Sequence, residues 1–140
     1  MYLFSITDPK LRRLLSRFRL SNHKLQIEVG RHIKPKQPLS ERICKLCDRN
    51  CIEDEEHFII HCTYYEDIRK EFLSIRHDLG LSKTVNFIEI MACENSCFYL
   101  AKCLERMFTK RNVFLTQHVV VLSVKKHLNI FINICDNLRF

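Results

Sequence analysis

The sequence predicts a mainly α-helical protein. The chain has 140 residues, of which 46% are hydrophobic, and this is enough apolar material for the core of one domain. It contains only two glycines and three prolines, which disfavours a turn-rich, all-β fold. Apolar residues also recur at helical spacing in several separate segments. We therefore expect one compact helical domain, whose elements are taken here in chain order.

Residues 1–31 predict basic N-terminal helices. Asp8 can cap a helix and Pro9 suits its first position. The apolar residues that follow have i, i+3, i+4, i+7 spacing, and they are Leu11, Leu14, Leu15 and Phe18. Residues 23–31 predict a second short helix that closes near Gly30. His23 is expected to be a hydrogen-bonded structural residue, because no cysteine lies near it in the sequence.

Residues 32–80 predict a metal-binding knuckle followed by a helix. A linker with two prolines, residues 32–42, leads into the spacing C-x2-C-x9-H-x4-C, formed by Cys44, Cys47, His57 and Cys62. The two-residue gap lets both sulfur atoms face one point about 2.3 Å away, which is the zinc–sulfur distance. The four residues together form a tetrahedral zinc set, so the predicted cofactor is Zn²⁺.

Other interpretations of these residues remain open at the level of sequence. His61 lies four residues after His57, so it can compete with Cys62 as a ligand, and Cys51 is a weaker rival. We favour Cys62 because thiolate is the stronger zinc ligand. Ordinary buried cysteines are one alternative. A redox-active C-x2-C pair is another, but it requires a preceding strand and a following helix, whereas the flanks here are charged loops.

Two helical segments are expected after the knuckle. Residues 53–56 are all acidic and predict the first turn of a helix, where its dipole favours acids. Residues 63–79 predict a longer amphipathic helix that Thr63 caps and Gly80 ends. Its apolar face consists of Tyr65, Ile68, Phe72, Ile75 and Leu79.

Residues 81–140 predict C-terminal helices. Residues 84–93 and 97–111 have helical spacing, whereas residues 112–140 allow either a helix or strands, and we favour a helix. Cys93, Cys97 and Cys103 suggest a second metal site, but core packing is the more common role of such cysteines. The predicted fold is thus a small helical domain with a zinc knuckle between basic N-terminal helices and a C-terminal helical bundle.

The distribution of charge predicts contact with phosphates. Residues 1–50 carry 12 Lys and Arg against 4 Asp and Glu, whereas residues 51–100 carry 4 against 10. A basic arm of this kind is typical of nucleic-acid backbone contacts. The expected contact residues are Arg12, Arg13, Arg17, Arg19, Lys34 and Lys36. No signal peptide or membrane span is apparent, so we expect an intracellular protein, in the cytoplasm or nucleus, that has reduced thiols and no membrane partner.

The wider sequence resembles a known family. The strings RFRLSNHKLQIEVGRH, RICKLC and IEDEEHFIIHCTYYEDIRKEF are similar to the region downstream of the polymerase domain in non-LTR (LINE-like) retrotransposon reverse transcriptases. The resemblance covers about residues 10–111 and is most specific over residues 17–72. It implies that Cys44, Cys47, His57 and Cys62 fill the family's zinc set. It also implies an accessory role in holding template RNA or target DNA, with a polymerase-bearing chain as partner.

The predicted function is therefore a non-catalytic, zinc-stabilised nucleic-acid-binding module. The chain lacks the Tyr-x-Asp-Asp sequence of a two-metal polymerase, a P-loop and a G-x-S-x-G motif, so we expect no enzymatic activity. The alternative is a zinc-stapled protein-interaction adaptor without nucleic-acid binding. In that case the apolar residues of 113–135 would dock a partner.

Overall fold

The protein is built almost entirely from helices. The computed structural model describes the backbone of residues 5–137 and the side chains of residues 5–124. Five α-helices occur in this described part: α1 (Pro9–Arg19), α2 (Gln26–His32), α3 (Glu66–Ser74), α4 (Phe87–Ala92) and α5 (Cys97–Asn137). Three shorter helical turns join them: η1 (Leu39–Glu41), η2 (His57–His61) and η3 (Thr63–Tyr65). The predicted mainly α-helical fold is thereby confirmed.

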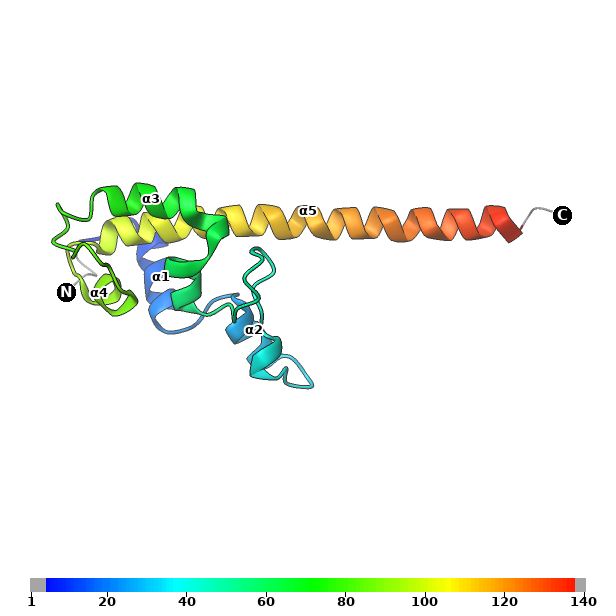
Figure 1. Cartoon of the computed structure of the whole chain (residues 1–140), viewed down its shortest axis with the longest axis horizontal. Coiled ribbons are helices and arrows are strands. Elements are labelled where there is room, and N and C mark those ends of the chain that lie inside the picture. Colours follow the sequence, from blue (N-terminus) through cyan, green and yellow to red (C-terminus); the bar gives the residue numbers. More distant parts are fainter. Residues whose placement is uncertain (1–4, 138–140) are drawn as a thin grey trace. The chain divides into compact units, whose positions relative to one another are not determined.

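The chain divides into two compact units, Met1–Met107 and Phe108–Phe140. The first unit contains α1 to α4 and the beginning of α5 (Figure 1). The second unit continues α5, whose backbone is described as far as Asn137. The predicted helix over residues 112–140 is therefore present, although residues 138–140 lie outside the described backbone. None of the helices in the described part combines the length and apolar character that a membrane span requires.

Helix α1 has the start and the buried face that the sequence predicts. The Asp8 side chain accepts a hydrogen bond of 2.7 Å from the Lys10 amide, and Pro9 occupies the first helical position. Leu11, Leu15 and Phe18 are buried. Because this apolar face packs in the core, the basic residues of α1 lie on its other faces.

Helix α2 differs from its prediction at both ends. It begins at Gln26 rather than His23, and it continues past Gly30 to His32. Gly30 is buried, and the side chain of Arg42 lies against it: a Cβ atom there would be 2.7 Å from Arg42 Cγ. The predicted end near Gly30 is thus two residues short of the observed end at His32. Because Gly30 has no side chain, the side chain of Arg42 can pack against this part of α2.

The core of the first unit contains a cluster of aromatic rings. Phe58 lies between Phe18 and Tyr65, with ring centroids 6.0 Å and 4.8 Å apart respectively. All three residues are at most 1% exposed. Helix α3 lies beside the first turns of α5 (Figure 1), and Glu71 and Arg106 form an ion pair of 2.7 Å there. This core fixes the chain on either side of the knuckle.

The helix predicted over residues 63–79 is shorter than expected. Helix α3 spans Glu66–Ser74 and is preceded by the tight turn η3, whose Tyr65 amide bonds to the carbonyl oxygen of Cys62 at 3.4 Å. Thr63 lies inside η3, so its predicted capping role was wrong. Gly80 ends the turn after α3 with φ of 72°, a conformation that favours glycine.

The C-terminal helices follow their predictions with shifted boundaries. Helix α4 begins at Phe87 rather than residue 84, because the side chain of Asn86 accepts a hydrogen bond of 2.8 Å from the Glu89 amide and caps the helix. Helix α5 continues without a break through residues 111 and 112. In the described part of the second unit, the large apolar side chains that are exposed are Val113, Val119, Val120, Val121, Leu122 and Val124.

Candidate metal centre

Backbone hydrogen bonds shape the knuckle that carries the first two cysteines. Ile43 and Ile52 form an antiparallel bridge, and the Cys44 amide donates to the carbonyl oxygen of Cys51 at 2.9 Å. Between them the chain turns through Asn50, whose φ of 52° is tolerated better by Asn than by most residues. This bridge therefore closes the loop that carries Cys44 and Cys47.

The other two residues of the set lie on a π-helical turn. The side chain of Asp54 accepts a hydrogen bond of 2.8 Å from the His57 amide and so starts the turn. Five residues on, the Cys62 amide donates to the carbonyl oxygen of His57 at 2.7 Å. This wide turn brings Cys62 back beside His57. Turns of this type are rare and are frequent at functional sites.

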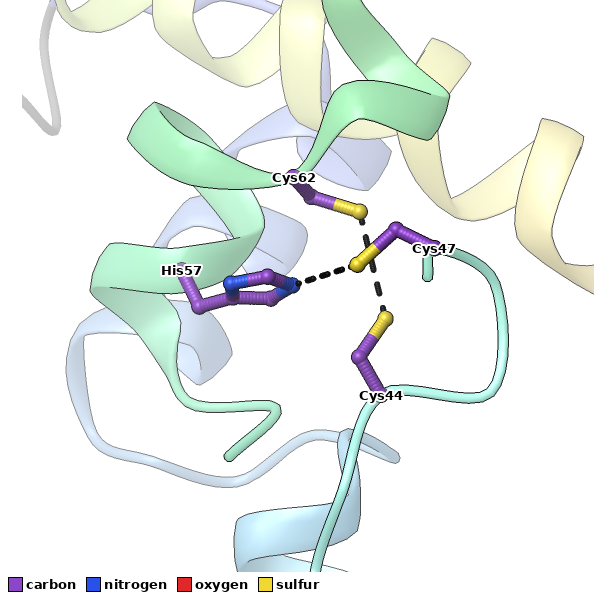
Figure 2. A group of neighbouring side chains, drawn as sticks. All are labelled: Cys44, Cys47, His57 and Cys62. Carbon is purple, nitrogen blue, oxygen red and sulfur yellow. Dashed lines mark hydrogen bonds between the residues drawn. The ribbon is translucent and has the colours of Figure 1, made fainter. Parts of the chain in front are cut away.

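The four side chains converge on one point, as Figure 2 shows. Their ligand atoms all lie within 4.8 Å of one another. The sulfur atoms of Cys44 and Cys62 are 3.9 Å apart, and Cys47 Sγ lies 3.4 Å from His57 Nε2. Zinc bond lengths of about 2.3 Å to sulfur and about 2.0 Å to nitrogen predict tetrahedral edges of roughly 3.8 and 3.5 Å. The group can therefore hold a metal ion.

The pKa values of the buried thiols depend on the neighbouring members of the group. Cys44, His57 and Cys62 are at most 5% exposed, and Cys47 is half-buried. The hydrogen bond from Cys62 lowers the pKa of the Cys44 thiol to about 3. The same bond, together with burial, raises the pKa of Cys62 well above its usual range. Protein groups alone thus favour only one thiolate in this pair, whereas a divalent cation would favour both.

The rival ligands lie outside the group. The His61 side chain is 51% exposed and its Nε2 lies 3.5 Å from Glu56 Oε1. Cys51 is exposed, and its thiol donates to the carbonyl oxygen of Arg49 at 3.3 Å. Among the residues whose side chains the structure describes, no second group of metal-ligating side chains is present, so Cys93, Cys97 and Cys103 form none. Burial raises the pKa of the Cys103 thiol to about 12.

Two of the acids at residues 53–56 form hydrogen bonds with residues 21–26. Glu53 precedes the helical turn instead of starting it, and its side chain, 1% exposed, accepts a hydrogen bond of 2.8 Å from the Gln26 amide. Glu55 Oε1 lies 2.8 Å from His23 Nε2 and accepts a bond of 2.6 Å from the Ser21 hydroxyl. The structural role predicted for His23 is confirmed. The bond to His23 lowers the pKa of Glu55 to about 2.

Two arginines that the sequence did not single out hold the surrounding backbone. Arg42 is 5% exposed and donates to the carbonyl oxygens of Gln37 and Ile27. Arg69, on α3, donates to the carbonyl oxygens of Ile59 and Cys62 at 3.1 and 2.8 Å. Burial lowers the pKa of the Arg69 guanidinium. No local pattern distinguishes these two residues from the other basic residues of the chain.

The predicted phosphate contacts differ in exposure. Arg13, Arg17, Lys34 and Lys36 are exposed, and Arg12 is half-buried. Arg19 is also half-buried: its Nη2 donates to the carbonyl oxygen of Met91 at 2.8 Å and lies 3.3 Å from the sulfur of Cys97. Arg19 therefore has a role within the fold that the charge pattern did not reveal.

No family model, curated protein or solved structure matches this chain.

Proposed function

We propose that the protein is a non-catalytic nucleic-acid-binding module whose fold is held by one zinc ion. The observation that carries this proposal is the convergence of Cys44, Cys47, His57 and Cys62, whose ligand atoms lie within 4.8 Å of one another. A set of three sulfurs and one imidazole is typical of structural zinc. Four protein ligands leave no coordination position for a reactive water, which supports a structural rather than a catalytic ion.

The charge of the first unit supports a nucleic-acid ligand. Arg13 and Arg17 are exposed on α1, and Lys34 and Lys36 are exposed in the segment before the knuckle. The similarity to the region downstream of the polymerase in non-LTR retrotransposons supports the same proposal, with a polymerase-bearing chain as a partner. Free cysteines at this centre suit a reducing, intracellular compartment.

Metal analysis and a salt titration test the proposal together. We expect one zinc ion per chain, and affinity for labelled single-stranded RNA or DNA that falls steeply between about 50 and 200 mM salt. Replacing Arg13 and Arg17 with glutamine should weaken binding to all sequences alike, because phosphate contacts carry little sequence information. Zinc-free protein with full structure, or binding that salt does not change, would overturn the proposal.

One observation favours the adaptor as a second candidate. The second unit exposes several large apolar side chains on more than one side of α5, among them Val120 and Leu122, and an exposed apolar helix can dock a partner protein. The adaptor requires that nucleic acid does not bind even at low salt. It also requires that Val120→Ser with Leu122→Ser abolishes capture of a purified partner chain. The apolar side chains beyond residue 124 lie outside the described residues.

A further inference from the structure

A polar pocket lies next to the metal centre, between the knuckle and α3. Its volume is about 300 Å³. The polar side chains that line it are Arg49, His61, Thr63, Glu66, Arg69 and Lys70. None of them belongs to the four-residue metal set. The pocket therefore needs an explanation of its own.

The charge of this pocket is positive. Arg49, Arg69 and Lys70 each carry one positive charge, and Glu66 is the one carboxylate among the lining residues. Glu66 Oε1 lies 2.8 Å from Lys70 Nζ, but both side chains are more than half exposed, so this i, i+4 pair is weak. Glu66 also interacts electrostatically with Arg69 and Arg49, so this one carboxylate balances only part of the charge of the three cations.

Arg69 is held in place before any ligand arrives. Its Nη1 and Nη2 atoms donate to the carbonyl oxygens of Ile59 and Cys62. A guanidinium has five N–H donors in a rigid plane, so these two bonds fix its orientation and leave further donors for an anion. The side chain is half-buried, which strengthens its interaction with an anion relative to an exposed lysine.

We propose that this pocket binds a phosphate group of a nucleic-acid backbone, with Arg49, Arg69 and Lys70 as the contacting cations and the Thr63 hydroxyl as a further donor. The inference rests on the proposed function. It adds a second phosphate contact to the one proposed for the exposed arginines of α1. Arginine and lysine are the residues that bind phosphate. The lining residues include no Phe, Tyr or Trp side chain on which a base could stack, and the one ring among them, His61, lies with its Nε2 3.5 Å from Glu56 Oε1. The pocket therefore holds the backbone and does not read sequence.

The test compares two variants that remove the same charge. Arg49→Gln with Lys70→Gln takes two cations from the pocket, while Lys45→Gln with Lys83→Gln takes two exposed lysines from outside it. The pocket variant should weaken binding to a labelled single-stranded oligonucleotide about tenfold. It should also lower the salt slope by roughly 1, as expected for one lost phosphate contact. The control should change affinity by about twofold or less, and equal effects would overturn the inference.

A third variant acts in the opposite direction. Glu66→Gln removes the one carboxylate that lines the pocket and releases Lys70 from its ion pair. We expect it to tighten oligonucleotide binding by about threefold, because the pocket then gains one unit of positive charge. Unchanged or weaker binding would contradict a phosphate at this site. The zinc content and melting temperature of each variant should equal those of the wild type, which separates binding from folding.

Inorganic phosphate distinguishes this inference from the function on which it rests. If oligonucleotides bind but the pocket and control variants behave alike, the pocket assignment fails and the proposed function stands. If the wild type binds no oligonucleotide, yet phosphate shifts the NMR amide signals of Thr63 and Lys70, the pocket takes free phosphate. That result would overturn the proposed nucleic-acid function. It would also overturn the proposal that the phosphate in the pocket belongs to a nucleic-acid backbone. If neither ligand binds, both proposals fail.

Discussion

The guanidinium Nη2 of Arg69 lies 2.8 Å from the carbonyl oxygen of Cys62, while Nη1 reaches the carbonyl oxygen of Ile59. The π-helical turn ends at His61, so these carbonyls lie at its C-terminal end, where helical carbonyls lack intrahelical partners. A positive charge at the C-terminal end of a helical turn interacts favourably with the helix dipole. A side chain of α3 therefore holds the backbone that carries one member of the metal set.

Loss of a ligand should unfold the knuckle. Cys44→Ser and Cys62→Ser should each abolish stoichiometric zinc binding and the ordered structure of residues 32–65. The reason is that zinc contributes roughly 10–16 kcal/mol in small finger peptides, against about 5–15 kcal/mol for the stability of a whole domain. Zinc analysis and circular dichroism measure both effects. Cys51→Ser, in the same loop, and Cys93→Ser are the controls, and equal losses in all four variants would contradict the assignment.

Gly30→Ala should destabilise the protein even though alanine is the better helix former. A Cβ atom at residue 30 would meet Arg42 Cγ at 2.7 Å and Cδ at 2.8 Å, and the guanidinium bonds hold that side chain in place. Overpacking costs about 1–3 kcal/mol, whereas the gain in helix propensity is about 1 kcal/mol. Urea unfolding measures the balance. In an Arg42→Ala background the same substitution should cost less, and an unchanged cost would refute the steric explanation.

Glu53→Ala should lower the free energy of unfolding by about 1–3 kcal/mol. The buried Gln26 amide would lose the carboxylate that accepts its hydrogen bond at 2.8 Å. Glu53→Gln should cost less, because its amide oxygen can still accept this bond. The matched control is Glu56→Ala, which removes an exposed carboxylate three residues along the chain and should cost well under 1 kcal/mol. A similar loss for both alanine variants would argue against the buried bond.

The pair of Glu55 and His23 should make stability depend on pH in the acid range. Hydrogen bonding to His23 lowers the pKa of Glu55 from 4.5 to about 2, so the folded protein binds this proton less readily than the unfolded chain. The stabilisation is therefore fully present above pH 4.5 and is lost as the pH falls toward 2. Glu55→Gln should remove this dependence. The check is the difference in unfolding free energy between wild type and variant at pH 6 and pH 3, which should shrink at pH 3.

The metal set was predictable because its signal is local. Two cysteines separated by two residues, and a histidine and a cysteine separated by four, predict a metal-binding group without any knowledge of the rest of the chain. Helix α1 was predictable for the same reason, since the cap at Asp8 and the apolar spacing lie within one segment. The choice of Cys62 over His61 agrees with the structure, but its geometric cause, the π-helical turn, was not foreseen.

What the sequence did not reveal depends on contacts between distant segments. Gly30 appears as a helix terminator until the side chain of Arg42 is known to lie against it. Glu53 is one of four consecutive acids, and its burial follows from its contact with Gln26, which is far away in the sequence. Arg19 belongs to a basic helix face by spacing, yet its guanidinium bonds to the backbone of Met91. Spacing within a segment contains no information about such partners.

The bridge between Ile43 and Ile52 has a kinetic consequence for an ion held at the centre. If the bond between the ion and Cys44 broke, the backbone hydrogen bond from Cys44 to Cys51 would keep the freed thiolate near the ion. Its local concentration at the ion remains high, so recapture outpaces escape. Exchange with a competing chelator should then proceed by stepwise detachment and take much longer than the breaking of any single bond.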